Sequence, residues 1–270
     1  MKKLLNNNDL NEALNNVSNL GFVPTMGSLH KGHISLIKKS KKQCSKTIVS
    51  IYVNPKQFNN KKDYKNYPRN FKRDLTTLKK LKVNFVYLPR TIDIYGSKKE
   101  TKIRLCNKDK IMCAKFRKGH FEGVIDVMRR LTKIIKPKKI FMGEKDYQQL
   151  YFIKKYIEKK YRIKIIGCKT IRNKKKLAFS SRNILLNRDQ IIKAEKFTQT
   201  IIAFRESIKK IKVTAKILNK KKRELSKLFK VQIQYFELRN TTNFKISNQI
   251  KKSKIFVAFF IDKIRLIDNF

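Results

Sequence analysis

Short apolar segments alternate with amphipathic helical segments over residues 20–167. This alternation is typical of a parallel sheet with helices on its faces, because neighbouring parallel strands need a long crossover connection between them. Strand character is found at Leu20–Pro24, Thr47–Val53, Val83–Leu88, Lys139–Met142 and Ile163–Gly167. Helices are expected to begin near His33, Phe71, Phe121 and Asp146. This part of the chain therefore predicts an α/β fold built on a Rossmann-like parallel sheet.

A different pattern follows Arg182. Two long basic helical stretches, at about residues 188–210 and 214–230, precede the apolar strand segments VQIQYFEL and KIFVAFF. The segment KIRLIDN resembles one more edge strand. Helices followed by short strands favour a smaller α+β domain with an antiparallel sheet. We place the first domain at residues 1–169 and the second at 170–270, with the junction near Lys169–Lys176.

The formal net charge of the chain is +49, from 68 Lys and Arg against 19 Asp and Glu. A charge of this size usually indicates a nucleic-acid or anionic partner. Here the basic residues are spread along the whole chain and accompany many Asn, Ile and Phe, few Gly and Pro and no Trp, which is the composition that an A/T-rich genome produces. We therefore predict no specific nucleic-acid partner, and only salt-sensitive, non-specific adhesion to RNA.

Membrane and secretory signals are absent from the sequence. No apolar run reaches the roughly 18 residues of a membrane span, and the two lysines at the N-terminus precede neither an apolar stretch nor a cleavage site. We expect a cytoplasmic protein without a membrane partner. The four cysteines are scattered without C-x-x-C spacing, so neither a zinc ribbon nor a disulfide framework is predicted.

The motif V-P-T-M-G-S-L-H-K-G-H, residues 23–33, lies where a strand ends and a helix begins. A helix N-terminus at this edge of a parallel sheet is a site for phosphate, and Gly27 and Gly32 allow the backbone to come close to a nucleotide. His30 and His33 are three residues apart, so they share one helix face. Two alternatives are a pair of surface histidines and a zinc site completed by His120. The absence of H-E-x-x-H and of suitably spaced cysteines disfavours zinc, and no residue is assigned as a metal ligand.

Four further segments carry side chains suited to acidic or phosphorylated ligands. They are S-I-Y-V-N-P-K-Q-F (50–58), R-K-G-H-F-E-G-V (117–124), F-M-G-E-K-D-Y-Q-Q-L (141–150) and T-I-R-N-K-K-K-L-A-F-S-S-R-N (170–183). The Gln57 amide can donate to a carboxylate and accept from a hydroxyl, although Gln57 also fits an ordinary turn after a strand. Arg117 can pair with a carboxylate or phosphate, and Lys145 can neutralise a triphosphate. In Y-P-R-N-F-K-R-D-L (67–75) the favoured interpretation of Asp74 is a first-turn carboxylate that complements the helix dipole, and His120 is interpreted as structural.

Taken in order, these segments resemble the pantothenate synthetase family. That family shares its H-x-G-H type signature with other nucleotidylyl transferases. The resemblance implies an ATP-dependent ligase that condenses pantoate with β-alanine through a pantoyl-adenylate intermediate and releases AMP and pyrophosphate, a step toward coenzyme A. It also implies Mg²⁺ as cofactor with the substrate ATP, a homodimer, and a second domain that acts as a lid and keeps water from the mixed anhydride.

The resemblance also implies roles for single residues. His33, His30 and Lys145 are expected to be catalytic, with a histidinium that donates hydrogen bonds to the phosphates. Pantoate and β-alanine are expected to contact Gln57, Gln149 and Arg117. ATP is expected to contact Met26, Gly27, Ser28, Leu29, His30, Lys31, Gly32, His33, Gly143, Glu144, Lys145, Asp146, Ile171, Phe179, Ser180, Ser181 and Arg182.

The chain departs from the family pattern at three positions. Lys118 replaces a proline, and Lys175 and Lys176 replace an acidic residue and a glycine in the loop expected to close on the phosphates, where they would stiffen the loop or attract phosphate. Two rival functions stay open. One is another nucleotidylyl transferase, which the uncharged polar pair Gln57 and Gln149 disfavours; the other is a basic RNA-binding protein that has lost catalysis, which the lack of an aromatic stacking platform disfavours.

Overall fold

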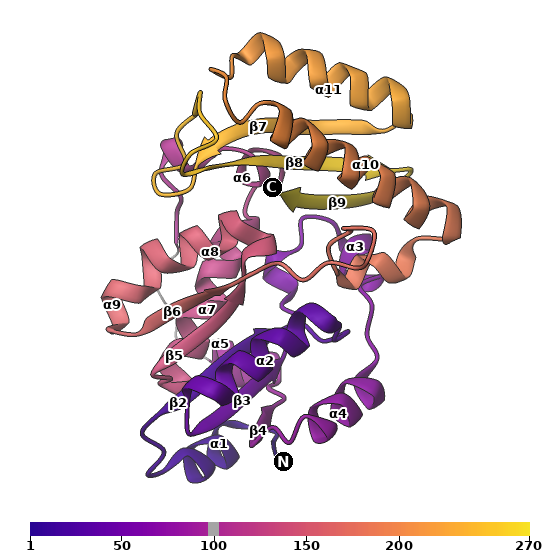
Figure 1. The fold of residues 1–270 in the computed structure, drawn as a ribbon. Helices are drawn as coiled ribbons and strands as arrows, with labels where there is room; N and C mark the ends of the chain where they lie inside the picture. The colour runs from indigo at the N-terminus through magenta and orange to yellow at the C-terminus, as the bar shows by residue number, and fades with distance from the viewer. Residues whose placement is uncertain (97–102) are drawn as a thin grey trace. The chain divides into compact units, whose positions relative to one another are not determined.

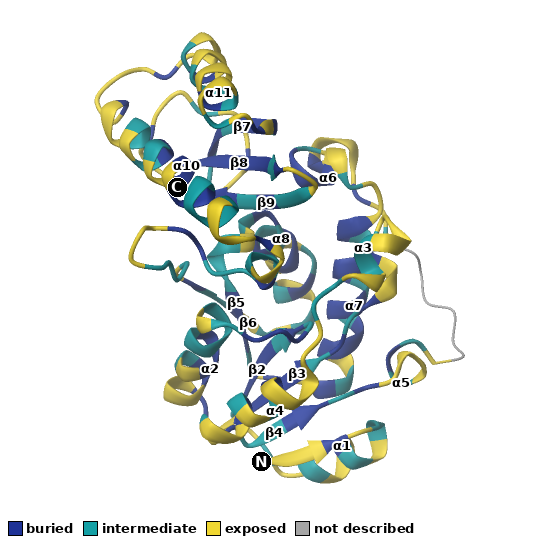
Figure 2. Cartoon of the chain, turned by 90° about the vertical axis from the view of Figure 1, so that its right-hand side faces the viewer, coloured by how far each residue is buried: buried dark blue, intermediate teal, exposed yellow. Residues whose placement is uncertain are grey.

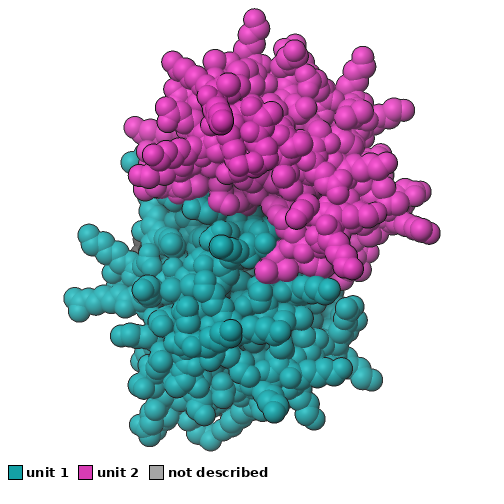
Figure 3. Space-filling model, in the orientation of Figure 1, with its two compact units in different colours: residues 1–170 teal, residues 171–270 magenta. Residues whose placement is uncertain are grey.

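The computed structural model describes residues 1–96 and 103–270 of the chain, which divides into two compact units, residues 1–170 and residues 171–270 (Figure 3). Unit 1 contains a six-stranded sheet with the strand order β1-β4-β3-β2-β5-β6, and every paired neighbour is parallel (Figure 1). The strands are β1 (Lys2–Leu4), β2 (Leu20–Thr25), β3 (Lys46–Ile51), β4 (Phe85–Tyr87), β5 (Lys139–Gly143) and β6 (Lys164–Cys168).

Helical segments connect the strands of unit 1. The α-helices are α1 (Asn7–Leu14), α2 (Lys31–Gln43), α3 (Lys61–Lys65), α4 (Phe71–Lys80), α5 (Thr91–Tyr95), α6 (Cys113–Phe116), α7 (His120–Ile135), α8 (Tyr147–Ile153) and α9 (Lys159–Tyr161). Single 3-10 turns occur at η1 (Pro55–Gln57), η2 (Asn107–Asp109) and η3 (Glu144–Asp146), and a π-helical turn, η4 (Lys154–Glu158), joins α8 to α9.

Alternating side chains of the central strands form the core on the two faces of this sheet. On one face Val23, Val49 and Phe141 pack against Ile37 of α2 and Leu78 of α4. On the opposite side α7 buries most of its length, and Figure 2 shows α2 and α7 on opposite sides of the strands. The central strands are therefore buried on both faces, as parallel strands usually are.

The predicted fold class is confirmed, and the predicted strands are present within a few residues of their expected bounds. Strand β1 was not predicted. It has only three residues and pairs with β4 in the register Lys2↔Phe85, so its strand conformation depends on a partner more than 80 positions away instead of on a local pattern. None of the helices in the described part of the chain is long and apolar enough to cross a membrane.

Unit 2 is a layer of two helices on a three-stranded antiparallel sheet with the order β7-β8-β9. Its elements are η5 (Ser181–Leu185), α10 (Arg188–Ser207), α11 (Ala215–Phe229), β7 (Gln232–Asn240), β8 (Ser253–Ile261) and β9 (Ile264–Asn269). Strand β9 lies at an edge of the sheet, as predicted from KIRLIDN. The segments at 188–210 and 214–230 are helical over most of their predicted lengths.

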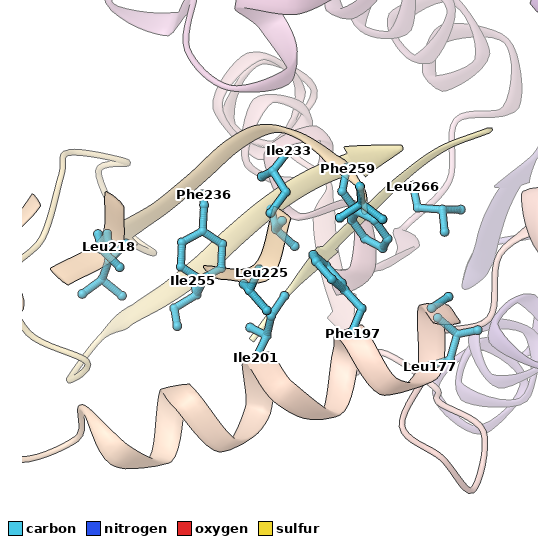
Figure 4. Close-up of a cluster of buried hydrophobic side chains, with 14 of the residues drawn as sticks. Leu177, Phe197, Ile201, Leu218, Leu225, Ile233, Phe236, Ile255, Phe259 and Leu266 are labelled. Atoms are coloured by element: carbon cyan, nitrogen blue, oxygen red, sulfur yellow. The ribbon is translucent and has the colours of Figure 1, made fainter. Parts of the chain in front are cut away.

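One apolar cluster holds unit 2 together. Phe197 and Ile201 of α10 point toward Ile255 and Phe259 of β8, and Leu225 of α11 joins the same cluster (Figure 4). The rings of Phe197 and Phe259 have centroids 4.1 Å apart. Alternate residues of β8 face both helices, so burial of one sheet face stabilises the unit.

Candidate active site

The first turn of α2 carries the two motif histidines. His30 is the N-cap, and its Nδ1 accepts the N–H of Gly32 at 3.1 Å. The Nδ1 of His33 accepts the N–H of His30 at 3.4 Å, so the pair forms a capping box in which imidazoles replace the usual hydroxyl and carboxylate. The two ring centroids are 4.0 Å apart, which brings both side chains to one point at the end of β2.

Both imidazoles are neutral in this geometry. Burial, followed by the charge of Lys145, lowers the pKa of His30 to about 4. Burial, followed by the charges of His30 and Lys145, holds the pKa of His33 well below its usual value. Since each Nδ1 accepts a backbone N–H, the proton of each neutral ring is on Nε2. In this geometry each neutral ring has one Nε2–H that can donate, and the histidinium expected beside bound phosphates stays a prediction.

The loop between β2 and α2 is held by a carboxylate from α4. The buried Asp74 accepts the N–H of Ser28 and the N–H of Leu29, both at 2.7 Å. This contact bends the loop, in which Gly27 and Ser28 have φ of +80° and +51°. Asp74 does lie in the first turn of its own helix, as predicted, but its oxygens bind the backbone of another segment, a role that the sequence did not predict.

The same contacts change the expected role of the loop backbone. The N–H groups of Ser28, Leu29 and Gly32 donate to protein acceptors, and the N–H of Gly27 donates to Thr25 Oγ1 at 3.2 Å. The sequence analysis predicted that backbone N–H groups of this helix N-terminus bind phosphate, but these four N–H groups already have acceptors within the protein. The side-chain donors at this point include the two imidazoles and Lys145.

Gln57 is buried in the turn that follows β3, and its amide is oriented by Asn54. Asn54 donates to Gln57 Oε1 at 3.4 Å, and Gln57 Nε2 donates to Met26 Sδ at 2.7 Å. Asn54 is itself 1 % exposed and accepts the hydroxyl of Tyr95 at 2.9 Å. This arrangement links Gln57 to the histidine loop through Met26. Asn54 was not predicted as a site residue, although its position directly before a proline in the same motif was a usable signal.

The first turn of α7 supports Gln57 from the other side. His120 Nδ1 donates to the carbonyl of Gln57 at 2.7 Å, and Arg117 Nη1 donates to His120 Nε2 at 2.8 Å. A Cβ on Gly123 would lie 2.3 Å from the carbonyl oxygen of Lys56, so only glycine permits this approach of helix and turn. The structural interpretation of His120 agrees with these contacts, which also place Arg117 beside the Gln57 turn.

The end of β5 contributes the segment G-E-K-D. Gly143 is the last residue of the strand, and the residues of η3 follow, with Lys145 Nζ 3.5 Å from Asp146 Oδ1. Lys145 acts on the pKa of both histidines, so the ends of β2 and β5 meet as the parallel topology requires. Gln149 is half-buried on the first turn of α8. Its neighbour Gln148 has a structural role, since its amide bonds the backbone at Ile111 and Cys113.

The predicted phosphate loop, residues 170–183, belongs almost wholly to unit 2. It forms a hairpin closed by an antiparallel bridge between Arg172 and Ala178. Lys176 occupies the family's glycine position with φ of +72°, a left-handed conformation that glycine adopts without cost. Lys175 lies 3.7 Å from Glu195, so part of its charge is balanced within the unit. Ser180 caps η5 by accepting the N–H of Arg182 at 3.3 Å.

No group of three or more His, Cys, Asp or Glu side chains placed to hold a metal ion is found within residues 1–96 and 103–270. Magnesium that accompanies a nucleotide needs only one or two carboxylates, because phosphates and water complete its octahedral shell. Glu144 and the exposed Asp146 meet that limited requirement at the end of β5.

The parallel sheet, the capped histidine pair and the lysine at the adjacent strand end define an α/β protein with side chains suited to a phosphorylated ligand at its strand ends. The family model described as pantoate-beta-alanine ligase matches residues 2–270. The chain therefore belongs to the pantoate–β-alanine ligase family, which confirms the resemblance and the predicted enzyme class.

Named relatives and solved structures match this chain over nearly its full length. The chain is 38 % identical over 270 residues to a pantothenate synthetase of Flavobacterium psychrophilum, with 96 % of this chain and 94 % of the relative covered. A Thermus thermophilus pantothenate synthetase structure superposes with a TM-score of 0.93 at 30 % identity, covering 100 % of this chain and 99 % of the other. A Francisella tularensis ligase complexed with β-γ ATP and β-alanine has a TM-score of 0.83 at 36 % identity, covering 100 % and 97 %.

Proposed function

We propose that the chain condenses pantoate with β-alanine at the expense of ATP, through pantoyl adenylate, and that the side chains converging at the ends of β2, β3 and β5 carry out this reaction. The observation that carries the proposal is the capping box of His30 and His33. In this capping box the Nδ1 atom of each neutral imidazole accepts a backbone N–H, so each ring keeps its Nε2–H to donate to a ligand. Both rings lie close enough to Lys145 for its charge to lower their pKa values.

The first step is adenylation. A carboxylate oxygen of pantoate attacks the α-phosphorus of ATP, the bond to the β-phosphate bridging oxygen breaks, and pyrophosphate leaves. Negative charge grows on the phosphate oxygens in the transition state, so preorganised N–H donors stabilise it. His30 and His33 would each donate from Nε2, and Lys145 would donate as a cation. Because the rings are already neutral and capped, no proton has to move to ready them.

The second step is amide formation. The amine of β-alanine attacks the acyl carbon of pantoyl adenylate, loses a proton and expels AMP. The protein supplies position and not a nucleophile. Gln57 would hold pantoate with the second hydrogen of Nε2, since the first points at Met26 and Oε1 accepts from Asn54. Gln149 and Arg117 complete the proposed pantoate and β-alanine site.

Further residues are proposed to contact ATP. Met26, Gly27, Ser28, Leu29, Lys31 and Gly32 would line the nucleotide from the β2–α2 loop, and Gly143, Glu144 and Asp146 from the end of β5. Ile171, Phe179, Ser180, Ser181 and Arg182 of unit 2 would contact adenine and phosphates. Mg²⁺ would arrive with ATP and offset the triphosphate charge, and Asp146 is the proposed carboxylate for its water shell.

Unit 2 is proposed as the lid of the reaction, because water competes with β-alanine for the mixed anhydride. A chain truncated after Gly167 would then lose part of its ATP site and also hydrolyse the pantoyl adenylate that it still forms, so the pantothenate formed per AMP released would fall well below one. Full amide formation by the truncated chain would refute the lid role. We also propose that the protein is cytoplasmic, because ATP is available there, and that it is a homodimer. A molar mass of twice the 32.1 kDa monomer mass, measured by light scattering on the purified chain, would agree with the homodimer.

The proposed activity is tested by AMP release from ATP, Mg²⁺ and pantoate, with and without β-alanine. We expect multiple turnovers only when all substrates are present. His33→Gln is the sharpest variant, because glutamine at this position preserves the capping box while it removes the imidazole. Loss of one such donor should lower kcat by about 10²- to 10³-fold. Lys38→Gln, on an exposed position of the same helix, is the matched control and should leave kcat unchanged.

Two outcomes would contradict the proposal. Turnover with a phosphorylated acceptor, and not with pantoate, would assign the chain to another nucleotidylyl transferase. Absence of any turnover, together with tight and salt-dependent RNA binding, would favour the RNA-binding alternative.

A further inference from the structure

Arg172, in the hairpin that precedes Ser180, is bound on all sides within unit 2. Its guanidinium donates to both carboxylate oxygens of Asp268, at 2.6 and 2.8 Å. It also donates to the carbonyls of Lys176 and Asn269, each at 3.0 Å, and stacks 4.8 Å above the ring of Phe270. A bidentate arginine–carboxylate pair is among the strongest and most directional contacts available to a protein. The Asp268 side chain is 5 % exposed, so water screens the pair little.

These contacts tie the hairpin to β9, 96 positions away in the sequence. Two hydrogen bonds lie within the hairpin: the N–H of Phe179 donates to the carbonyl of Ile171, and the N–H of Leu177 donates to Asn173 Oδ1. Its tip needs the left-handed conformation of Lys176, and the bond from Arg172 to the Lys176 carbonyl stabilises that conformation. Arg172 therefore binds the hairpin at Lys176, the position where the family pattern has a glycine.

Strand β9 also supports the far end of the segment. Arg182 Nη1 donates to the carbonyl of Arg265, which lies on β9 four residues from its end. The two ends of the loop, Arg172 and Arg182, thus rest on the same edge strand. Between them lie Phe179, Ser180 and Ser181, the residues proposed to contact ATP.

We propose that the Asp268–Arg172 ion pair is a positioning element for ATP binding: it holds residues 173–182 in the conformation that presents Ser180, Ser181 and Arg182 to the phosphates. Arg172 and Asp268 act through the loop and not on the reacting atoms. The inference rests on the proposed function, since it assigns the loop to ATP. Without the pair, the loop would sample other conformations, and ATP would have to order it at the cost of affinity.

Asp268→Asn is the first variant, because it removes the charge and one acceptor while it keeps the shape. We expect the KM for ATP and the Kd for ATP measured calorimetrically to rise about tenfold, the change that corresponds to about 1.4 kcal/mol of lost loop ordering. The KM values for pantoate and β-alanine should stay within twofold. Arg172→Lys, which keeps the charge and loses the planar fork, should show the same selectivity.

Glu237→Gln is the matched control. Arg239 Nε donates to Glu237 at 2.5 Å and Arg239 Nη1 donates to the carbonyl of Phe244 at 2.6 Å, so this is also an arginine–carboxylate pair that fastens a turn to the sheet of unit 2. None of its residues is proposed to contact a substrate. A general loss of stability in unit 2 would therefore raise the KM for ATP in both variants, whereas a positioning role raises it only in Asp268→Asn.

Hydrogen exchange gives a second readout on the full chain. The amides of Leu177 and Phe179 should exchange faster in Asp268→Asn, while those of β8 stay protected. Unchanged ATP affinity, or an equal effect of Glu237→Gln, would overturn the proposal. Should Asp268→Asn fail to fold, Arg172→Lys is judged by the same criteria. A wild-type chain that binds ATP but forms no pantothenate would refute the proposed function alone, because the ATP affinities still decide the role of the pair.

Discussion

The carboxylate of Asp74 accepts the backbone N–H of Leu29 at 2.7 Å across 45 positions of the sequence. A second oxygen of the same carboxylate takes the N–H of Ser28, so one side chain of α4 shapes the loop that leads into the histidine pair. The site therefore depends on a residue that need not touch a ligand. This kind of support is what keeps reactive side chains in place.

Replacement of Asp74 by asparagine should disturb this loop. An asparagine has one acceptor oxygen, and its amide N–H₂ would face a backbone N–H, so the variant should lose about 1.5–3 kcal/mol of unfolding free energy in urea. The KM for ATP should rise in parallel. Asp189→Asn removes an exposed carboxylate from the first turn of α10 and should cost less than about 1 kcal/mol. Equal losses of unfolding free energy in the two variants would contradict the role of Asp74 in holding the Ser28–Leu29 loop.

Gly123→Ala should displace the Gln57 turn. The added methyl would lie 2.3 Å from the Lys56 carbonyl oxygen and 3.0 Å from Gln57 Cα, so the helix or the turn must move. We expect a loss of about 1–3 kcal/mol in unfolding free energy and a higher KM for pantoate. For stability the control is Gly143→Ala, whose Cβ would meet no atom within 4 Å. An alanine at position 123 that left both quantities unchanged would show that the contact can relax.

Lys176→Gly should stabilise the chain. The left-handed conformation costs a non-glycine residue roughly 1–2 kcal/mol, which glycine would remove. The greater conformational freedom of glycine in the unfolded chain offsets roughly 0.5–1 kcal/mol of this stabilisation. The net increase should be up to about 1 kcal/mol, measured as a higher urea midpoint. Lys174→Gly, in the same turn but without positive φ, should lower the midpoint instead. The reverse order would mean that Lys176 is not strained.

Acid should weaken the fold through His30. Its pKa is about 4 in the folded chain against 6.5 when unfolded, so between these values the unfolded chain binds more protons and stability falls as the pH falls. From pH 7.5 to pH 5.0 the contribution should be at most about 2 kcal/mol. Asparagine caps helices as well as any residue, so His30→Asn should keep the cap and lose less stability over this range. Parallel pH profiles for the two chains would contradict a lowered pKa at His30.

The sequence by itself determined the parallel α/β architecture and the motifs that meet at its strand ends. Apolar periodicity reports burial within a few residues, so β2, β3, β5, α2 and α7 are visible without a structure. The parallel topology then brings the ends of β2 and β5 together, and Lys145 indeed acts on both histidines. For the same reason β1, with three residues and no local pattern, was not visible.

Only the tertiary structure decided what several of these residues do. Asp74 serves the Ser28–Leu29 loop, Asn54 orients Gln57, and Asp268 fastens Arg172, each through contacts with a partner whose identity no local pattern reports. The protonation of His30 and His33 also depends on the fold, because burial and the approach of Lys145 lower their pKa values. A sequence specifies which groups are present; their partners, burial and charge state depend on distances that arise only when the chain is folded.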